Sequence, residues 1–169
     1  MKKNIAVLLL ALAGMGAFAK NISIQIVQNN PAAQDSVCAS SSLIEQTILD
    51  YFFGTGHIVT NSPVYVKVGA AADDGLKTAL SESAEGGMDY LVRIEVDYKP
   101  AERSNNPDAI LLENIDRVTW KNYAVKTGLQ LSDGSEHIGT VNRQNNNENG
   151  VSSFANLVAL KISASLNGR

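Results

Sequence analysis

Residues Tyr90–Tyr98 carry the clearest strand pattern in the chain. Apolar or aromatic side chains occupy every second position of this segment, and charged residues lie between them at Arg93, Glu95 and Asp97. Because successive side chains of a strand point to opposite faces of a sheet, the pattern predicts one covered face and one largely solvated face. The chain is therefore expected to build its core on one side of a sheet.

Helical and extended patterns alternate along the rest of the chain. Isoleucines at every second position predict a first strand over residues 21–26, and apolar residues at helical spacing predict helices over 42–53, 73–85 and 152–166. Further extended segments lie at 58–68, with an interruption at 61–63, and at 118–131 and 137–142. This order predicts the α/β class, an α+β sandwich with about three helices on a small mixed sheet of about four to five strands.

Local signals place the ends of the helices. Ser41 or Ser42 is the predicted N-terminal cap of the first helix, and Gly54 is predicted to end it. The last helix is predicted to bury one apolar stripe, made by Phe154, Leu157, Val158, Ile162 and Leu166.

A C-terminal hairpin is predicted between the last two extended segments. Asp-Gly pairs tolerate positive φ, so Asp133-Gly134 predicts a tight turn over residues 132–135. The apolar pattern shifts its phase between Trp120 and Tyr123, which predicts a bulge at residues 121–122.

The first nineteen residues have the three parts of a secretory signal peptide. Two lysines precede the apolar stretch 5–13, and small residues follow it, with Ala17 and Ala19 in an A-x-A cleavage pattern. Cleavage is expected after Ala19, so that Lys20 starts a single globular domain over residues 20–169. That mature chain has 12 basic and 17 acidic residues, and no later stretch is apolar enough to span a membrane. The expected location is the periplasm or the medium.

Composition excludes several classes of function. A mature charge of −5 argues against nucleic acid or an anionic membrane surface as the main partner. A single cysteine excludes an intramolecular disulfide framework, and no cofactor or metal site is expected. Cys38 lies too far beyond the apolar stretch for a lipid anchor. We expect a half-buried free thiol there, with an intermolecular disulfide as the alternative.

No catalytic constellation is evident in the sequence. The chain contains neither a phosphate-binding glycine motif nor G-x-S-x-G. An alternative to a binding module is a small-molecule-binding protein or a small hydrolase. That alternative predicts a pocket in which His57, Glu95 and His137 converge.

Partner contacts are expected at aromatic residues and at a long connection. Trp120 and Tyr123 are candidate anchors, since a phase shift between them would expose one side chain. The connection 99–114 contains Pro100 and Pro107, and connections of this length in a compact domain are usually functional or mobile. Asp133 in the predicted turn completes the expected contact set.

Three stretches resemble the periplasmic α/β domain shared by LpoB-type activators of penicillin-binding proteins, CsgG and the amino-terminal domain of TolB. They are Gly56-His57-Ile58-Val59 after the first helix, the strand entry 85–92 (EGGMDYLV) and the hairpin strand 129–134 (LQLSDG). The lipid-anchor cysteine, the TolB propeller and the channel-forming segments of CsgG are absent. The resemblance implies the fold and a non-enzymatic adaptor role with an envelope protein as partner, and it leaves the partner and the oligomeric state open. A third alternative is a protein that associates with itself.

Overall fold

The computed structural model describes residues 19–68, 75–100, 106 and 108–167, so Ala17 and Pro107 lie outside the described residues. Its elements follow in the order β1 (Asn21–Asn29), α2 (Ala39–Gly54), β2 (Ile58–Asn61), β3 (Tyr65–Val66), α3 (Leu76–Glu85), β4 (Tyr90–Tyr98), η3 (Leu112–Asn114), β5 (Ile115–Ala124), β6 (Leu129–His137) and α4 (Glu148–Asn167).

The strands form one mixed sheet with the order β2-β1-β4-β5-β6, and β3 also pairs with β1. β1 is parallel to β2, β3 and β4, whereas β5 is antiparallel to β4 and β6. The predicted α/β class and mixed sheet are confirmed. The sheet has six strands because β2 and β3, which the sequence pattern treats as one interrupted region, are separate strands on β1.

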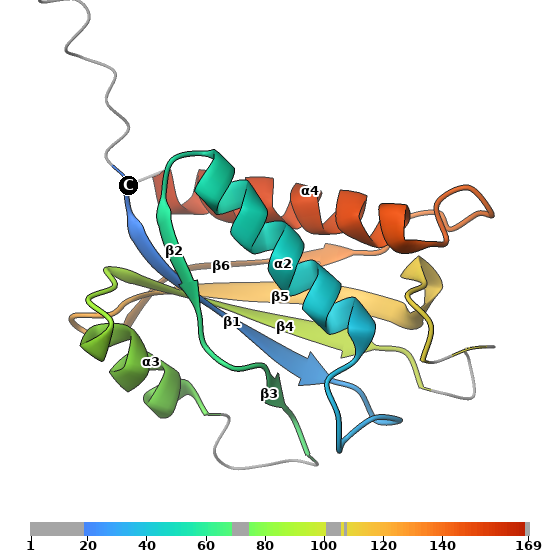
Figure 1. Cartoon of the computed structure of the whole chain (residues 1–169), viewed down its shortest axis with the longest axis horizontal. Helices are drawn as coiled ribbons and strands as arrows, with labels where there is room; N and C mark the ends of the chain where they lie inside the picture. Colours follow the sequence, from blue (N-terminus) through green and yellow to red (C-terminus); the bar gives the residue numbers. More distant parts are fainter. Residues whose placement is uncertain (1–18, 69–74, 101–105, 107, 168–169) are drawn as a thin grey trace, which may run out of the picture.

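The main core lies between the sheet and two helices. Figure 1 shows α2 and α4 side by side on one face of the sheet, and α3 on the opposite face. The even-numbered side chains of β1 and β4 point into this core, which explains the alternation in the sequence. Fully buried members include Ile22, Ile24, Ile26, Val92, Ile94, Ile48, Phe52, Val158 and Ile162.

Among the described helices, only α3 lies on the opposite face of the sheet, and it covers one end of that face. Under α3, Ala79 packs with Leu91, Tyr123 and Val125 in a second, smaller apolar cluster. Arg93 is also buried, at 8% exposure. The prediction that this face of β4 is largely solvated is therefore wrong at its α3 end, and Glu95 and Asp97 on the remainder are half-buried.

The predicted turn at residues 132–135 is wrong, because these residues lie inside β6. The chain turns instead at residues 125–128, where Gly128 adopts a φ of 67° and its N–H donates to the carbonyl of Ala124 at 2.8 Å. Gly134 lies opposite Trp120 in the β5–β6 register, and this tertiary contact overrides the local turn preference of Asp-Gly.

The expected bulge lies on the other strand of this hairpin. The register of β5 with β6 shifts between Asn122 and Tyr123, so that Leu131 of β6 is the extra residue. β5 itself pairs regularly with β4 through this region. Trp120 and Tyr123 therefore point to opposite faces simply because they are three residues apart in one strand.

α2 ends at Gly54 as predicted, but the start of this helix and the buried stripe of α4 differ from prediction. α2 begins at Ala39, so Ser41 and Ser42 lie inside its first turn and neither is its N-cap. Cys38 precedes the helix without a side-chain cap hydrogen bond, and its own N–H donates to Oε1 of Gln28 at 2.7 Å. Leu157 of α4 is 42% exposed and does not belong to the buried stripe. Within the described ranges, none of the helices is long and apolar enough for a membrane span.

Candidate functional site

The part of the sheet beyond α3 carries a row of polar side chains, and we call this surface the open face. Odd-numbered residues of β1, β4 and β5 point to it, and no described helix covers them. It comprises Asn29, Lys67, Glu95, Asp97, Arg117, Thr119, Lys121 and Asp133, together with Val27 and Arg93, which are buried at 2% and 8% exposure.

Asp97 anchors one row across three strands of the open face. One carboxylate oxygen accepts from Nδ2 of Asn29 at 2.7 Å, and the other accepts from Arg117 at 2.8 Å and 3.2 Å. The hydrogen bonds and the charge of Asp97 raise the pKa of the Arg117 guanidinium. The Asp97 side chain is only 13% exposed, so this row is held in a fixed arrangement.

A second ion pair lies beside the first. Nζ of Lys67, just after β3, donates to Oε1 of Glu95 at 2.9 Å, and both side chains are about one-third exposed. Exposed ion pairs of this kind add little to the stability of the fold. Their effect here is to fix charges of known sign at known positions on the sheet.

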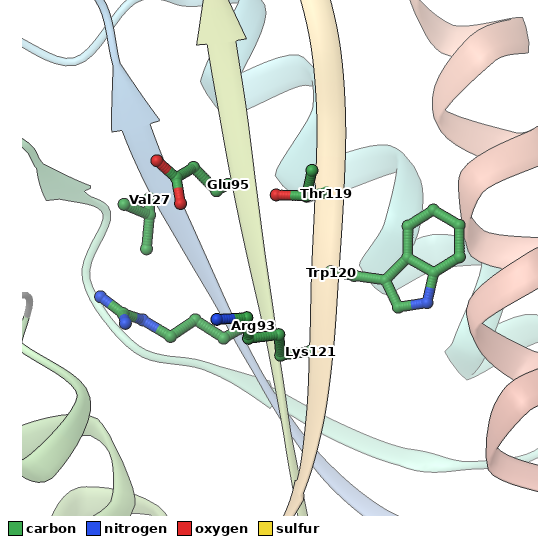
Figure 2. Close-up of a pocket in the computed structure, with 6 residues that line it drawn as sticks. All are labelled: Val27, Arg93, Glu95, Thr119, Trp120 and Lys121. Atoms are coloured by element: carbon green, nitrogen blue, oxygen red, sulfur yellow. The ribbon is translucent and has the colours of Figure 1, made fainter. Parts of the chain in front are cut away.

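A small cavity of about 50 Å³ opens beside these rows, lined by residues of β1, β4 and β5. Figure 2 shows Val27, Arg93 and Glu95 on one side of β4, and the Trp120 ring on the opposite side, toward α4. Trp120 lines the cavity, but its indole ring points away from the cavity, toward α4. Thr119 and Lys121 complete the lining.

Arg93 is the most deeply held charge of the cavity. Its Nε donates to Oε1 of Gln25 at 3.0 Å, and its Cζ lies 6.0 Å from the centre of the Tyr65 ring. A guanidinium at that distance is attracted by the ring quadrupole. The cation is thus fixed between β1 and β3.

The residues predicted as partner contacts do not gather in one place. Trp120 and Tyr123 are buried, at 5% and 6% exposure on opposite faces of the sheet, so neither is an exposed anchor. Asp133 and Pro100 are exposed, Asp133 on β6 and Pro100 after β4. Lys20, the expected start of the mature chain, immediately precedes β1.

The structure does not bring His57, Glu95 and His137 together. His57 accepts a hydrogen bond from the N–H of Lys20 at 3.2 Å, next to the start of β1. Glu95 pairs with Val27 near the other end of β1, about 20 Å away by strand geometry. His137 ends the edge strand β6 and is exposed. Within the described residues, no group of three His, Cys, Asp or Glu side chains could hold a metal ion.

His57 is expected to give the protein a pH-dependent stability. Burial and the nearby Lys20 charge lower the pKa of His57 below 6.5. The unfolded chain then binds the proton more tightly, so the free energy of unfolding should fall as pH drops from about 6.5 through the lowered pKa. Urea unfolding of wild type and His57→Asn across this range should show a flatter profile for the variant. An unchanged slope would assign the pH dependence to other groups.

Cys38 lies just before α2 and is half-buried, as expected. That its thiol stays free remains a prediction. Its Sγ accepts from Nδ2 of Asn30 at 3.2 Å, and burial raises the pKa of the thiol. A raised pKa lowers the fraction of reactive thiolate. The alternative of an intermolecular disulfide stays a prediction.

The open face was missed as a unit by sequence reasoning. The pattern places Glu95 and Asp97 on one strand face, but their partners Lys67 and Arg117 come from segments that the sequence does not align. Arg117, Thr119 and Lys121 occupy every second position of one predicted strand, and this spacing could have placed them together on one face of the sheet. Because the turn was predicted at residues 132–135, the register of β5 with β6 could not be predicted correctly.

Comparison with known proteins places the fold. A family model with the description "Uncharacterised protein" matches residues 21–167. No curated protein matches the sequence. The PelC dodecamer from Paraburkholderia phytofirmans matches with a TM-score of 0.51 and 14% identity, over 89% of this chain and 89% of that one. PelC therefore shares this fold.

Two of the three families that the sequence resembles are also among the structural matches. TolB from Acinetobacter baumannii matches over 90% of this chain and 30% of its own, with 15% identity and a TM-score of 0.42. The LpoB C-terminal domain from Escherichia coli matches over 80% of this chain and 94% of its own, with 9% identity and a TM-score of 0.44.

Proposed function

We propose that this chain, which belongs to the family described as "Uncharacterised protein", is an exported, non-enzymatic protein-binding module of the bacterial cell envelope. The proposed binding surface is the open face of the sheet. Export is inferred from the signal-peptide pattern of the first nineteen residues.

The fixed charges of the open face are the observation that carries this proposal. Asp97 holds Asn29 and Arg117, and Glu95 holds Lys67, so these side chains are already ordered before a partner arrives. Ordering side chains is one of the main costs of association, and a surface that has met this cost in advance binds more tightly. Fixed charges also select partners and orient them during encounter.

The comparison with PelC supports the same class of function. The solved PelC assembly is a dodecamer, so in that protein the fold makes contacts between protein chains. A sheet with helices on one full face and on part of the other leaves a flat surface available for such contacts.

Affinity capture tests the proposal directly. The mature chain from Lys20 serves as bait in detergent-solubilised bacterial envelope extract, and retained proteins are identified by mass spectrometry. Thr119→Arg should abolish capture of the enriched partner, because a long cation would then project from the middle of the open face. The control Asn156→Arg adds the same charge on the outer side of α4, where the side chain is exposed.

Loss of capture with Thr119→Arg alone, in a variant whose circular dichroism matches wild type, would support the open face. Equal capture by both variants would refute it. Retention of only further copies of the chain would replace the adaptor with a self-associating protein, the third alternative from the sequence.

A further inference from the structure

The strand β6 presents one side of its backbone at the edge of the sheet. It pairs with β5 on one side, and no described strand lies on the other. The N–H of Ile138, directly after β6, donates to the carbonyl of Asp116 on β5. The backbone groups of successive residues alternate between the two sides of an antiparallel strand, so those of Asp133, Ser135 and His137 point away from β5. An edge of this kind is a template for pairing with another chain.

This edge lacks most of the features that prevent pairing. Proteins protect exposed edges with very short strands, prolines, lysines or bulges. β6 has nine residues, with neither proline nor lysine among them. Its irregularity at Leu131 leaves residues 132–137 in regular register with β5. The strand at the opposite edge, β2, has only four residues. Of the two edges, β6 is therefore the one suited to pairing.

The helix above this edge exposes apolar side chains on the same side. Lys161 of α4 pairs with Glu136 of β6, and this pair marks the side of α4 that faces the edge. Leu157 lies one helical turn before Lys161, and Leu160 and Ala164 continue the exposed stripe at spacings of three and four residues. Leu157 and Leu160 are 42% and 56% exposed. We call residues 132–137 and this stripe together the β6 flank.

The spacing of strands and helices suits a second copy on the β6 flank. α4 lies over β5 as well as β6, since Nδ2 of Asn122 donates to Oγ of Ser165 at 2.8 Å. Antiparallel pairing of β6 with β6 of a second copy sets these strands about 4.8 Å apart. The two copies of α4 are then two strand spacings apart, about 10 Å, which is the distance at which helices pack. Their apolar stripes face each other across that space.

One register of this pairing brings unlike side chains together. A two-fold axis at Ser135 places Asp133 of each copy opposite His137 of the other, so an imidazole N–H can donate to a carboxylate on both sides of the axis. An axis at Asp133 would instead oppose two carboxylates, which destabilises pairing. Within its own chain Asp133 has Lys121 as its β5 neighbour and accepts from Gln130 at 3.4 Å. The edge is thus complementary to itself in the Ser135 register.

We infer that the β6 flank is a homodimer interface, in which two copies of the chain join their sheets through β6 about a two-fold axis at Ser135. Ser135 pairs with its own copy, and Asp133 pairs with His137 on each side, with two backbone hydrogen bonds in each pair. The axis is perpendicular to the sheet, so α2 and α4 of both copies lie on one side and both open faces lie on the other. The inference does not depend on the proposed function, but a dimer would present that binding surface twice.

Sedimentation velocity of the mature chain from Lys20, over a series of concentrations, measures the association. Wild type should sediment as a dimer. Leu160→Glu should raise the dimer dissociation constant about tenfold or more, because each dimer loses the apolar contact twice. The control Ile58→Glu removes a similarly exposed apolar side chain from β2 at the opposite edge and should leave the dimer unchanged. Ser135→Pro removes the outward N–H on the axis and should give a monomer, whereas Ser135→Ala keeps it and should stay dimeric.

Cysteine cross-linking tests the register. In a Cys38→Ser background, Ser135→Cys places two thiols at the axis with their Cα atoms about 5.5 Å apart, within the range that a disulfide spans. His137→Cys places its two Cα atoms about 14 Å apart along the paired strands, which is too far. Non-reducing electrophoresis after mild oxidation should show a covalent dimer for Ser135→Cys alone.

Three outcomes would overturn the inference. They are a monomer at every concentration, equal weakening of a dimer by Leu160→Glu and Ile58→Glu, and equal cross-linking at residues 135 and 137. Should Ser135→Pro alter the circular dichroism, Leu160→Glu on the helix surface and the two cysteine variants still decide. In each case envelope capture that is lost with Thr119→Arg would leave the proposed function standing.

Discussion

Replacement of Gly150 by alanine is expected to destabilise the protein by about 2–3 kcal/mol, although alanine is the better helix former by about 1 kcal/mol. Gly150 is buried in the first turn of α4, and an added Cβ would overlap the backbone carbonyl of Asn145, with the carbonyl carbon at 2.7 Å. The steric cost exceeds the helix propensity because the neighbour is backbone rather than a flexible side chain.

Asn145 cannot move aside cheaply, because its own contacts fix the loop before α4. Its Nδ2 donates to the carbonyl of Thr140 at 2.9 Å, and its Oδ1 accepts from the N–H of Asn142 at 2.7 Å. Relief of the overlap would therefore break hydrogen bonds of the loop as well as shift α4.

Gly139 provides the matched control for this substitution. An added Cβ there meets nothing within 4 Å, and its φ is not positive. Gly139→Ala should change the free energy of unfolding by less than about 1 kcal/mol, and in the stabilising direction. Urea unfolding followed by circular dichroism measures both variants, and equal stability of the two would contradict the close approach of Asn145 to α4.

Elements with a strong period were predictable from sequence, because their side chains report their own burial. The alternation in Tyr90–Tyr98 and the isoleucines of β1 gave two adjacent central strands, and α2 followed from its apolar spacing. The boundaries were less accessible. α2 starts at Ala39, after Cys38, and the N–H of Cys38 donates to the side chain of Gln28 ten residues earlier. No local sequence pattern contains that contact.

The open face shows the same limit for function. Glu95 and Asp97 are two residues apart in one strand, so the sequence alone predicts that both lie on one polar face. The partners that fix them come from β1, β5 and the segment after β3, and their alignment depends on strand register. The register of β5 with β6 is set by the position of the turn between them. The local turn preference of Asp133-Gly134 placed that turn at residues 132–135 instead of 125–128.

Gly134 should tolerate alanine only when Trp120 is also smaller. An added Cβ at Gly134 would lie 2.6 Å from Cε2 of the Trp120 indole, which packs on the glycine from the opposite strand. The indole is buried between the sheet and α4 and has no free space to retreat into. Gly134→Ala should therefore cost about 2 kcal/mol through overpacking.

A double-mutant cycle with Trp120→Leu separates this contact from general effects of a strand glycine. Trp120→Leu alone should destabilise by about 2–3 kcal/mol, since it removes buried apolar surface and leaves a cavity. In its background Gly134→Ala has room for the Cβ, so the double variant should be more stable than the sum of the single losses by about 1–2 kcal/mol.

The cycle also decides why Asp133-Gly134 is not a turn. A coupling of that size would mean that the glycine is required by the indole that covers it, which is a tertiary reason for a residue usually assigned to turns. Strict additivity, with Ser135→Ala as a neighbouring control on the exposed side, would place the cost in the backbone of β6 instead. Urea unfolding of the four proteins of the cycle provides the measurement.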